Sequence, residues 1–376
     1  MIKRIYIVGA GFYGLTIAEQ AARKLGLECI VFESRDHIGG NAYSYPDSKT
    51  GIEIHKYGSH IFHTNNKSVW DYVNNFSQFN NYEHRVVVNA SERKYTMPIT
   101  LDTISDVYGR IFSPEEARKL IESERRFEFE DNLEGFALNQ VGRKIYELLI
   151  AGYTEKQWGQ NPKFLPKEII KRIPIRYDFD TRYFTDEFQG IPLLGYGELF
   201  KNMVSNSKIK IEINYQFKKS DVELRSNDLL IYSGPIDAYY EFGLGHLGWR
   251  TLDFEISTLS IPDYQGCSVI NYADREIPYT RIHEFKHLHP ERQKLDETII
   301  AREFSRQATE IDEPYYPINS VHDRRLLLRY RDLIKAEKNV LFGGRLGSYH
   351  YLDMHMAIAG AISDFNSVVV PWFYEN

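Results

Sequence analysis

Cysteine, long apolar runs and strong net charge are all scarce in this chain of 376 residues. Its only cysteines are Cys29 and Cys267, too few for a disulfide-based scaffold, and their scarcity favours a reducing compartment. No apolar run is long enough to span a bilayer, and Met1 leads directly into a strand pattern instead of a signal peptide. The formal net charge of −6 argues against nucleic acid as a partner. We therefore expect a cytoplasmic protein without a transmembrane segment.

The overall composition is that of a globular protein with a sizeable core. Hydrophobic residues make up 43% of the sequence and charged residues 26%, a balance that excludes a disordered chain. The length exceeds what a single core usually supports, so we expect two or three domains.

The most informative pattern opens the chain. Residues 5–8 form a short apolar, β-branched run typical of a buried parallel strand, and a G-x-G-x-x-G sequence follows directly. Residues 15–25 then show helical apolar spacing, and residues 29–32 predict a second strand. In such a unit the glycines permit a tight turn and a close approach to a pyrophosphate, and an acidic residue accepts a ribose hydroxyl. The pattern predicts a dinucleotide site made by Gly9, Gly11, Phe12, Tyr13, Gly14, Glu33 and Ser34.

Two further glycine segments favour FAD over NAD as the dinucleotide. Gly40-Asn41 follows soon after the acidic residue, and residues 339–342 form another strand-like run that ends in Gly343-Gly344-Arg345. A helix-like segment begins near Asp353. A distant strand that brings glycines to the same ligand suits FAD, which is long and must be held at both ends. An ordinary strand–turn–helix without a ligand is the alternative at this stage.

The middle of the chain indicates a helical insertion followed by strands. Ser113-Pro114-Glu115-Glu116 is a helix start with a capping box, inside an α-rich stretch from about 100 to 155. Residues 85–89 and 94–97 predict a hairpin, 209–213 and 229–235 predict strands, and 249–304 shows the short alternation of an antiparallel sheet. The segment 57–64 places a glycine beside two histidines, which are either site residues or satisfied core histidines. Their spacing does not indicate a metal site.

Five segments spread over the whole chain together resemble the bacterial UDP-galactopyranose mutase family. They are His60–Thr64, Gly152–Gly159, Pro278–Arg281, Pro314–Pro317 and Gly344–Met354. The resemblance implies an FAD enzyme, active with reduced flavin, that interconverts the pyranose and furanose forms of a nucleotide sugar without net redox change. In this family N5 of the reduced flavin attacks the anomeric carbon and forms a flavin–sugar adduct.

The resemblance also implies an α/β architecture with three regions. A discontinuous Rossmann-like FAD-binding domain would comprise residues 1–85, 205–245 and 318–376. A helical domain would comprise residues 100–155, and an antiparallel-sheet substrate domain would comprise residues 86–99, 156–204 and 246–317.

Matches to the family motifs assign the site residues. Arg176 and Arg281 match two essential arginines, which can stabilise the charge of a departing diphosphate without a metal; a surface ion pair is the alternative for either. His60 and His63 match the segment that lines the flavin and are assigned catalytic roles. Further cofactor contacts are Gly40, Asn41, Ile61, Arg345, Asp353 and Met354. Further substrate contacts are Tyr153, Thr154, Trp158, Tyr183, Asn271, Tyr315 and Tyr351.

Four positions depart from the family pattern. His84 stands where an asparagine is usual near the sugar, and Leu149-Ile150 stand where a Phe-Phe pair is usual beside the uracil. Ser59 replaces a common proline or alanine, and His355 replaces a common aspartate. His84, Leu149 and Ile150 are expected substrate contacts. We therefore expect UDP-galactose as the leading substrate, with dTDP-fucose or UDP-N-acetylgalactosamine as alternatives.

Two other functional classes share the predicted FAD domain: a flavin amine oxidase or dehydrogenase, and a non-catalytic flavoprotein. The set of arginines and tyrosines argues against both, because neither class needs to bind a diphosphate. The expected product is a furanose donor for a cell-surface polysaccharide such as O-antigen. The sequence does not set the oligomeric state, and a homodimer is one alternative.

Overall fold

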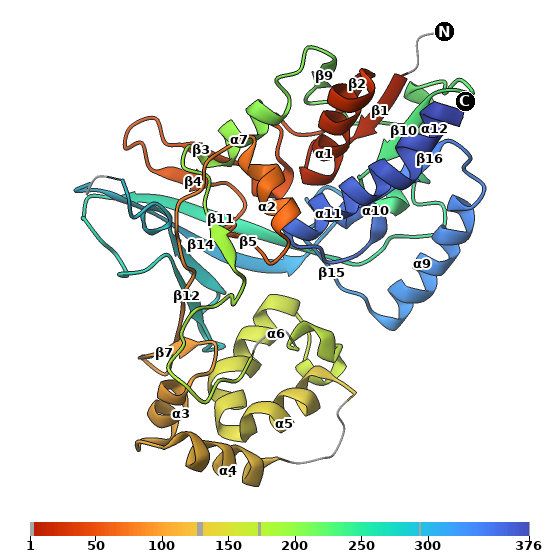
Figure 1. Cartoon of the computed structure of the whole chain (residues 1–376). Coiled ribbons are helices and arrows are strands. Elements are labelled where there is room, and N and C mark those ends of the chain that lie inside the picture. The colour runs from red at the N-terminus through yellow and green to blue at the C-terminus, as the bar shows by residue number, and fades with distance from the viewer. Residues whose placement is uncertain (1–3, 126–130, 172–173, 293–294, 376) are drawn as a thin grey trace.

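A five-stranded parallel sheet forms one end of the molecule in the computed structural model, which describes residues 4–125, 131–171, 174–292 and 295–375 (Figure 1). The strand order is β16-β10-β1-β2-β9, and all neighbouring pairs are parallel. The strands are β1 (Arg4–Val8), β2 (Glu28–Phe32), β9 (Ile209–Glu212), β10 (Leu229–Tyr232) and β16 (Val340–Phe342). The strands predicted near residues 209, 229 and 339 are therefore confirmed, and three distant parts of the chain form one sheet.

Two helices cover this sheet on the side of the glycine sequence. Helix α1 (Phe12–Gln20) continues into η1 (Ala21–Leu25), and α11 (Met354–Asp364) continues through η8 (Phe365–Val369) into α12 (Val370–Glu375). The stretch Met354–Tyr374 is long and apolar enough to cross a membrane, with a mean hydropathy of 1.3, which the sequence analysis did not anticipate. One line of its residues, Ile358, Ala361, Phe365 and Val369, is buried in the same apolar core as α1, while most of the stretch is only partly buried or exposed.

A seven-stranded sheet lies beside the parallel sheet and carries most of the candidate substrate residues. Its order is β15-β11-β14-β13-β12-β6-β7, with antiparallel pairing throughout except between β12 and β6. The strands are β6 (Val86–Ala90), β7 (Arg93–Met97), β11 (Trp249–Leu259), β12 (Val269–Tyr272), β13 (Arg281–Glu284), β14 (Thr298–Gln307) and β15 (Tyr316–Pro317). The predicted hairpin and antiparallel sheet are confirmed. The parallel pair is an exception, because β6 joins the sheet from a distant part of the chain.

The helical layer lies below the seven-stranded sheet in Figure 1. It contains α3 (Leu101–Tyr108), α4 (Pro114–Glu124), α5 (Leu133–Ile145), η3 (Tyr146–Ala151) and α6 (Gly152–Trp158). The predicted capping box is present: Ser113 Oγ accepts from the Glu116 amide, and Glu116 Oε2 accepts from the Ser113 amide. The apolar sides of these helices share one core with β6 and β7.

Two cations, the half-buried Lys156 and the buried Arg250, fix α6 to the seven-stranded sheet. The Lys156 ammonium donates to four backbone carbonyls of the β12–β13 connection, at 2.7 Å to Tyr272 and Asp274, 3.0 Å to Ile277 and 3.2 Å to Tyr279. Arg250 of β11 donates through Nε to the Gln157 carbonyl at 3.0 Å, close to the helix C-terminus. The side chains of α6 are therefore held in place relative to β13.

The smaller elements complete the layers. Hairpin β3 (Ser44–Pro46)–β4 (Glu53–His55) and the pair β5 (Phe62–Thr64)–β8 (Phe188–Gly190) lie between the two large sheets, with α2 (Lys67–Asn74) and α7 (Gly195–Met203) nearby. The C-terminal half adds α8 (Ile236–Tyr239), α9 (Val321–Ile334) and α10 (Gly344–Ser348). The predicted α/β fold class, with a Rossmann-like part, helices and an antiparallel sheet, is confirmed. The exact domain boundaries stay a prediction.

Candidate active site

The glycine sequence between β1 and α1 makes a surface that a backbone or a ligand can approach closely. Gly9 has a positive φ of 95°, and a Cβ there would lie 2.3 Å from Ser233 Oγ. Gly11 faces Gly40, since a Cβ on Gly40 would lie 3.3 Å from the Gly11 Cα. Gly11 is the N-cap of α1 and provides no side chain for its free amides. Backbone N–H groups at a bare helix start fit a pyrophosphate, so these residues fit the predicted dinucleotide.

The acidic residue after β2 is held against the glycine sequence. Glu33 Oε2 accepts from the Ala10 amide at 2.7 Å, and Oε1 accepts from the Arg35 amide at 3.0 Å. Arg35 donates to Asn41 Oδ1 at 2.7 Å, which joins the two predicted cofactor segments. Glu33, Ser34, Gly40 and Asn41 are therefore neighbours in space.

The side chains of Phe12 and Tyr13 do not face this surface. Phe12 is buried with its ring centroid 4.6 Å from that of Phe200, and Tyr13 donates to Asp364 at 2.6 Å. Their side chains are thus engaged elsewhere and their backbone groups are what they can offer to a cofactor, whose contact with these two residues stays a prediction.

The second glycine segment, after β16, packs directly on α1. A Cβ on Gly343 would lie 2.1 Å from the Tyr13 ring, so only glycine fits at that position. The following α10 positions Arg345, which donates to the Leu352 carbonyl at 2.7 Å and fixes the chain that leads to α11. Asp353 is the N-cap of α11 and makes no side-chain cap bond, so the first amides of α11 carry no side-chain cap. The C-terminal segment thus brings a second helix N-terminus without a side-chain cap toward the surface made by the glycine sequence between β1 and α1.

His60 lies in the segment between β4 and β5 as a half-buried, neutral histidine. Its Nδ1 is hydrogen-bonded to the Gly58 carbonyl at 2.8 Å, so Nδ1 carries the proton and Nε2 keeps a lone pair. Burial lowers the pKa of His60 to about 4, aided by the nearby Arg345. Ile61 beside it belongs to an apolar cluster, which leaves only its backbone for a ligand.

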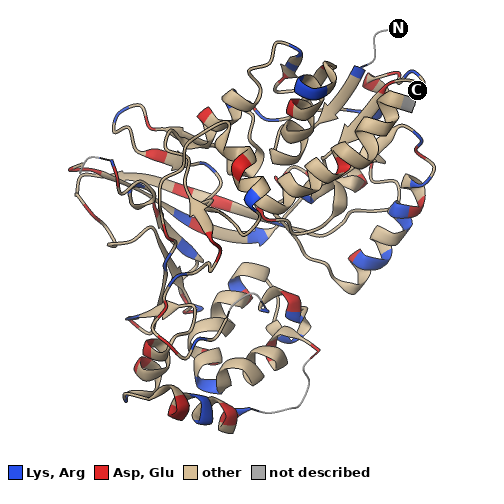
Figure 2. Ribbon diagram, in the orientation of Figure 1, with Lys and Arg blue, Asp and Glu red and all other residues tan. Residues whose placement is uncertain are grey.

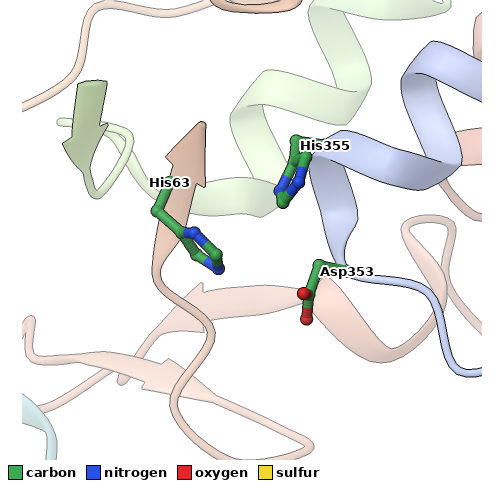
Figure 3. A group of neighbouring side chains, drawn as sticks. All are labelled: His63, Asp353 and His355. Carbon is green, nitrogen blue, oxygen red and sulfur yellow. The ribbon is translucent and has the colours of Figure 1, made fainter. Parts of the chain in front are cut away.

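His63 points toward the start of α11, where Asp353 and His355 lie (Figure 3). Each of the three offers one potential ligand atom, and these atoms lie within 4.8 Å of one another, an approach that the sequence did not predict. His63 Nδ1 is already engaged with Asp186 at 2.9 Å, and its ring stacks on Phe184 at 3.7 Å. These two contacts fix the orientation of the His63 ring.

Arg281 is the centre of a buried polar network on β13 and β14. Its Nε and Nη2 both donate to the Tyr153 hydroxyl, the first at 3.0 Å, and its Nη1 lies 3.5 Å from Glu303 Oε2. Glu303 also accepts from Thr280 at 2.9 Å and pairs with His283 Nε2 at 3.0 Å. Despite complete burial, Arg281 and His283 lower the pKa of Glu303 to about 2. The guanidinium therefore has a fixed position and a permanent charge.

Ser59 extends this network to the segment that holds His60. Its Oγ lies 2.9 Å from His283 Nδ1, and its amide donates to the same nitrogen at 3.4 Å. Because Nδ1 accepts, His283 carries its proton on Nε2 and donates to Glu303. Glu303, His283 and Ser59 were missed by the sequence analysis as site residues, although Ser59 had been noted as a departure.

Aromatic side chains connect Arg281 to the C-terminal segment. Trp158 lies 6.3 Å from Tyr316 between ring centroids, Tyr316 lies 5.9 Å from Tyr351, and the Arg345 guanidinium lies 5.0 Å from the Tyr351 ring. Tyr316 also interacts electrostatically with Arg281. The neighbouring Tyr315 instead packs near Tyr57, at 6.2 Å. The structure therefore places Tyr316 beside the arginine and Tyr315 nearer to Tyr57, and the predicted substrate contact of Tyr315 stays a prediction.

Arg176 is engaged with the backbone of its own loop. Its Nη1 donates to the backbone carbonyls of Asp180 at 2.7 Å and Arg182 at 2.5 Å, and its Nη2 is buried without a hydrogen bond to a described residue. Tyr183, which follows Arg182 in the chain, interacts electrostatically with Tyr153, the hydrogen-bond partner of Arg281. Arg176 therefore organises the loop that carries Tyr183.

His84 and Asn271 lie beside the polar network around Arg281. His84 is buried beside Tyr183, with Nδ1 bonded to the Tyr82 hydroxyl at 3.1 Å, and burial together with the charge of Arg281 lowers its pKa to about 3. Asn271 of β12 is the direct antiparallel partner of Arg281, so both side chains lie on one face of the sheet. These two predicted substrate residues are thus neighbours of the arginine.

The predicted base contacts are more deeply buried than the sequence suggested. Leu149 is 2% exposed and Ile150 is 4% exposed, and both belong to the core of the helical layer. Thr154 is also buried. These residues shape the wall behind Tyr153 and Trp158 and offer little surface of their own, and their contact with a base stays a prediction.

Comparisons with known proteins agree with this arrangement. A family model described as UDP-galactopyranose mutase matches residues 148–351, and a model described as an NAD(P)-binding Rossmann-like domain matches residues 7–76. A protein of Klebsiella pneumoniae described as a probable UDP-galactopyranose mutase is 42% identical over 362 residues, which cover 96% of this chain and 93% of the relative. A dTDP-fucopyranose mutase of Escherichia coli is 40% identical over 367 residues, which cover 96% of this chain and 97% of the relative.

The solved structures extend the likeness at the level of the fold. A crystal structure of a reduced UDP-galactopyranose mutase superimposes with a TM-score of 0.77 at 16% identity, covering 98% of this chain and 94% of the other. A putrescine oxidase variant superimposes with a TM-score of 0.60 at 11% identity, covering 98% of this chain and 99% of the other. The oxidase shares the fold alone, whereas the sequence relatives also span the arginine and tyrosine segments.

Proposed function

Because the chain belongs to the UDP-galactopyranose mutase family, we propose that it is a flavin-dependent isomerase that interconverts the pyranose and furanose forms of a nucleotide sugar, with UDP-galactose as the leading substrate. The observation that carries the proposal is the fixed Arg281, held by Tyr153 and Glu303 and joined through Tyr316 and Tyr351 to the predicted cofactor segment.

The arginine group fits the chemistry of a departing diphosphate. Breaking the bond between the sugar and the diphosphate builds negative charge, and a guanidinium that is already positioned stabilises that charge without reorganisation. Tyr153 holds two nitrogens of Arg281, which leaves the Nη1 side between Glu303 and the aromatic residues. Trp158 and Tyr316 supply flat surfaces on which a nucleotide can pack. Arg176 would act from its loop, through Tyr183 or after a change in its carbonyl contacts.

The cofactor is proposed to be FAD in its reduced state. The facing glycines Gly11 and Gly40 and the bare starts of α1 and α11 are supporting observations, since an added Cβ or a capping side chain would compete with the ligand. Reduced FAD would supply a nucleophilic N5 toward the sugar. His60 is neutral near pH 7, so its Nε2 can accept a hydrogen bond in that region without adding charge. The N-terminal end of α11 favours negative charge, as an anionic reduced flavin would carry.

A thymidine donor is the second candidate. His84 is neutral because its pKa is about 3, so it acts on the sugar by hydrogen bonding instead of by charge. The aliphatic side chains of Leu149 and Ile150 give the wall behind the proposed base site a different shape from that of two aromatic rings. Thymine carries one methyl more than uracil, and one extra methyl in a fitted pocket changes specificity about 10- to 200-fold. The similar identities to a UDP-galactopyranose mutase and a dTDP-fucopyranose mutase, 42% and 40%, keep both donors in view.

The test compares oxidised and dithionite-reduced protein with each donor. Purified protein should be yellow, and reduced protein should convert UDP-galactofuranose to UDP-galactopyranose, resolved by chromatography, without consuming electrons. Equal rates for the oxidised and reduced protein would contradict a nucleophilic flavin. Conversion of neither uridine nor thymidine donors would contradict the proposed substrate class.

Location and assembly are further parts of this proposal. Two unpaired cysteines, Cys29 and Cys267, support a reducing cytoplasmic compartment. A homodimer and delivery of the product to a polysaccharide such as O-antigen remain proposals that gel filtration and genetic context can test.

A further inference from the structure

Helix α9 presents a basic and apolar face to solvent, away from the active site. Its inner side is buried through Leu326, Leu327 and Tyr330, which pack beside Trp249 and Tyr349. On the opposite side Val321 is 58% exposed and Leu328 is 60% exposed, seven residues apart on one line of the helix. We call this side, with the arginines that flank it, the α9 face.

Four arginines flank the two exposed apolar residues of the α9 face. Helical spacing puts Arg324 and Arg331 on one flank and Arg325 and Arg329 on the other, and all four are exposed. Figure 2 shows the resulting blue bands along α9. None of the four forms an ion pair with a residue in the described ranges. This concentration of positive charge without ion-pair partners contrasts with the net charge of −6 of the whole chain.

The basic surface continues across a cavity to the segment after α6. Val321 and Arg324 line this cavity together with Lys163, Phe164 and Lys167. Phe164 is 72% exposed, and the Lys163 ammonium lies 5.0 Å from its ring. The same combination of an exposed apolar side chain and unbalanced cations thus recurs on the two sides of the cavity.

Acidic residues on this surface are few and mostly engaged. Asp332 pairs with Lys335 at 2.7 Å, Glu168 pairs with Lys171 at 3.3 Å, and Asp131 lies 3.7 Å from Lys167. Within each pair the two charges neutralise each other, so these carboxylates do not offset the positive charge of the four arginines and Lys163. The local charge is therefore strongly positive although the molecule as a whole is negative.

We propose that the α9 face docks on the surface of an anionic lipid membrane. Arginine guanidinium groups bind phosphate oxygens of lipid headgroups in a bidentate manner, while Val321, Leu328 and Phe164 enter the interface between headgroups and acyl chains. Juxtaposed cations and exposed aliphatic side chains are typical of helices that lie on anionic membranes. A nucleic acid would use the arginines but gain nothing from Leu328, so the apolar residues favour the membrane. The inference does not depend on which nucleotide sugar the enzyme converts.

The experiment measures cosedimentation of the full-length protein with lipid vesicles. Vesicles of phosphatidylcholine that contain about one third phosphatidylglycerol are compared with pure phosphatidylcholine vesicles, at about 0.1 M and about 0.5 M salt. The test variant replaces Arg324, Arg325, Arg329 and Arg331 by glutamine, which keeps helix propensity and removes four charges. The matched control replaces four other exposed cations, Lys49, Arg93, Lys94 and Lys210, by glutamine. A third variant, Leu328→Ser, removes the central apolar residue alone.

The wild-type protein is expected to bind the anionic vesicles at least about tenfold better than the neutral ones, with loss of binding at the higher salt. The arginine variant should lose at least about tenfold, Leu328→Ser should lose less, and the control should bind like wild type. Flavin absorbance and circular dichroism of each variant establish that it is folded. Absence of binding, equal binding to neutral vesicles, or full binding by the arginine variant would each overturn the proposal. So would a wild-type protein that binds a polyanion such as heparin but not the vesicles.

Discussion

Glu303→Gln removes the one negative charge at the centre of the Arg281 network without changing its size. The carboxylate is 1% exposed and has three partners, Thr280, His283 and Arg281. An amide in its place still accepts from Thr280, but its NH₂ group faces two donors, Arg281 and His283 Nε2. The substitution therefore leaves the half-buried Arg281 guanidinium without its counter-charge.

The expected loss of stability follows from the pKa of the carboxyl group. The network lowers the pKa of Glu303 from 4.5 to about 2. Each pKa unit corresponds to about 1.4 kcal/mol, so the ionised form stabilises the folded protein by about 3 kcal/mol at neutral pH. Because the folded pKa lies below the unfolded one, this stabilisation is complete above about pH 4.5 and is lost as the pH falls toward 2. About 1 kcal/mol of it should already be gone at pH 4.

Urea unfolding followed by circular dichroism at pH 7 and pH 4 measures this difference. At pH 7 the variant should be less stable than wild type by about 3 kcal/mol, and at pH 4 the gap should be smaller by about 1 kcal/mol. Glu255→Gln, an exposed position on β11 of the same sheet, should change stability by less than about 0.5 kcal/mol at either pH. A gap for Glu303→Gln that does not change with pH would refute the electrostatic reasoning.

Three further predictions concern activity. Arg281→Ala should lower kcat at least about a hundredfold while the flavin absorbance stays, because a charged partner of the developing diphosphate is lost. Arg176→Ala should lower kcat to a similar extent, about a hundredfold, because the loop that carries Tyr183 loses the guanidinium that organises it. Near-normal turnover in either variant would remove that residue from the site. Lys156→Met should raise KM for the nucleotide sugar by about tenfold or more and destabilise the protein by about 2 kcal/mol, because four backbone carbonyls lose the ammonium that they share. Lys156→Arg should recover part of the loss in KM and part of the loss in stability. Measured as kcat/KM, UDP-galactofuranose should exceed dTDP-fucofuranose by about tenfold, and the reverse preference would replace the leading substrate.

Local patterns in the sequence predicted the elements that local physics determines. The strand, glycine turn and helix around Gly9 follow from φ preferences and helix periodicity within one short stretch, and the Ser113 capping box follows from four residues. The predicted hairpin and the strands near residues 209, 229 and 339 also need only alternating or apolar runs. These features require no knowledge of distant partners.

The network around Glu303 could not be predicted because it depends on strand register. Arg281 and Glu303 face each other only in the observed β13–β14 pairing, and a shift by one residue would turn one of them to the other face of the sheet. A motif likewise does not tell which of the neighbours Tyr315 and Tyr316 lies beside Arg281. It gives the position of Leu149 and Ile150 along the chain but not the direction of their side chains on the helix, so their deep burial was not predicted.

The order in which the parallel sheet is assembled has a consequence for synthesis of the protein. The sheet takes β1 from the start of the chain and β16 from residues 340–342, and the glycines and helix that follow β16 close the cofactor surface. A nascent chain that has left the ribosome as far as residue 300 therefore has the first glycine turn but neither Gly343 nor α11. Contacts of such large sequence separation form late and slowly. The apolar face of α1 that packs on α11 therefore lacks this partner until translation is nearly complete.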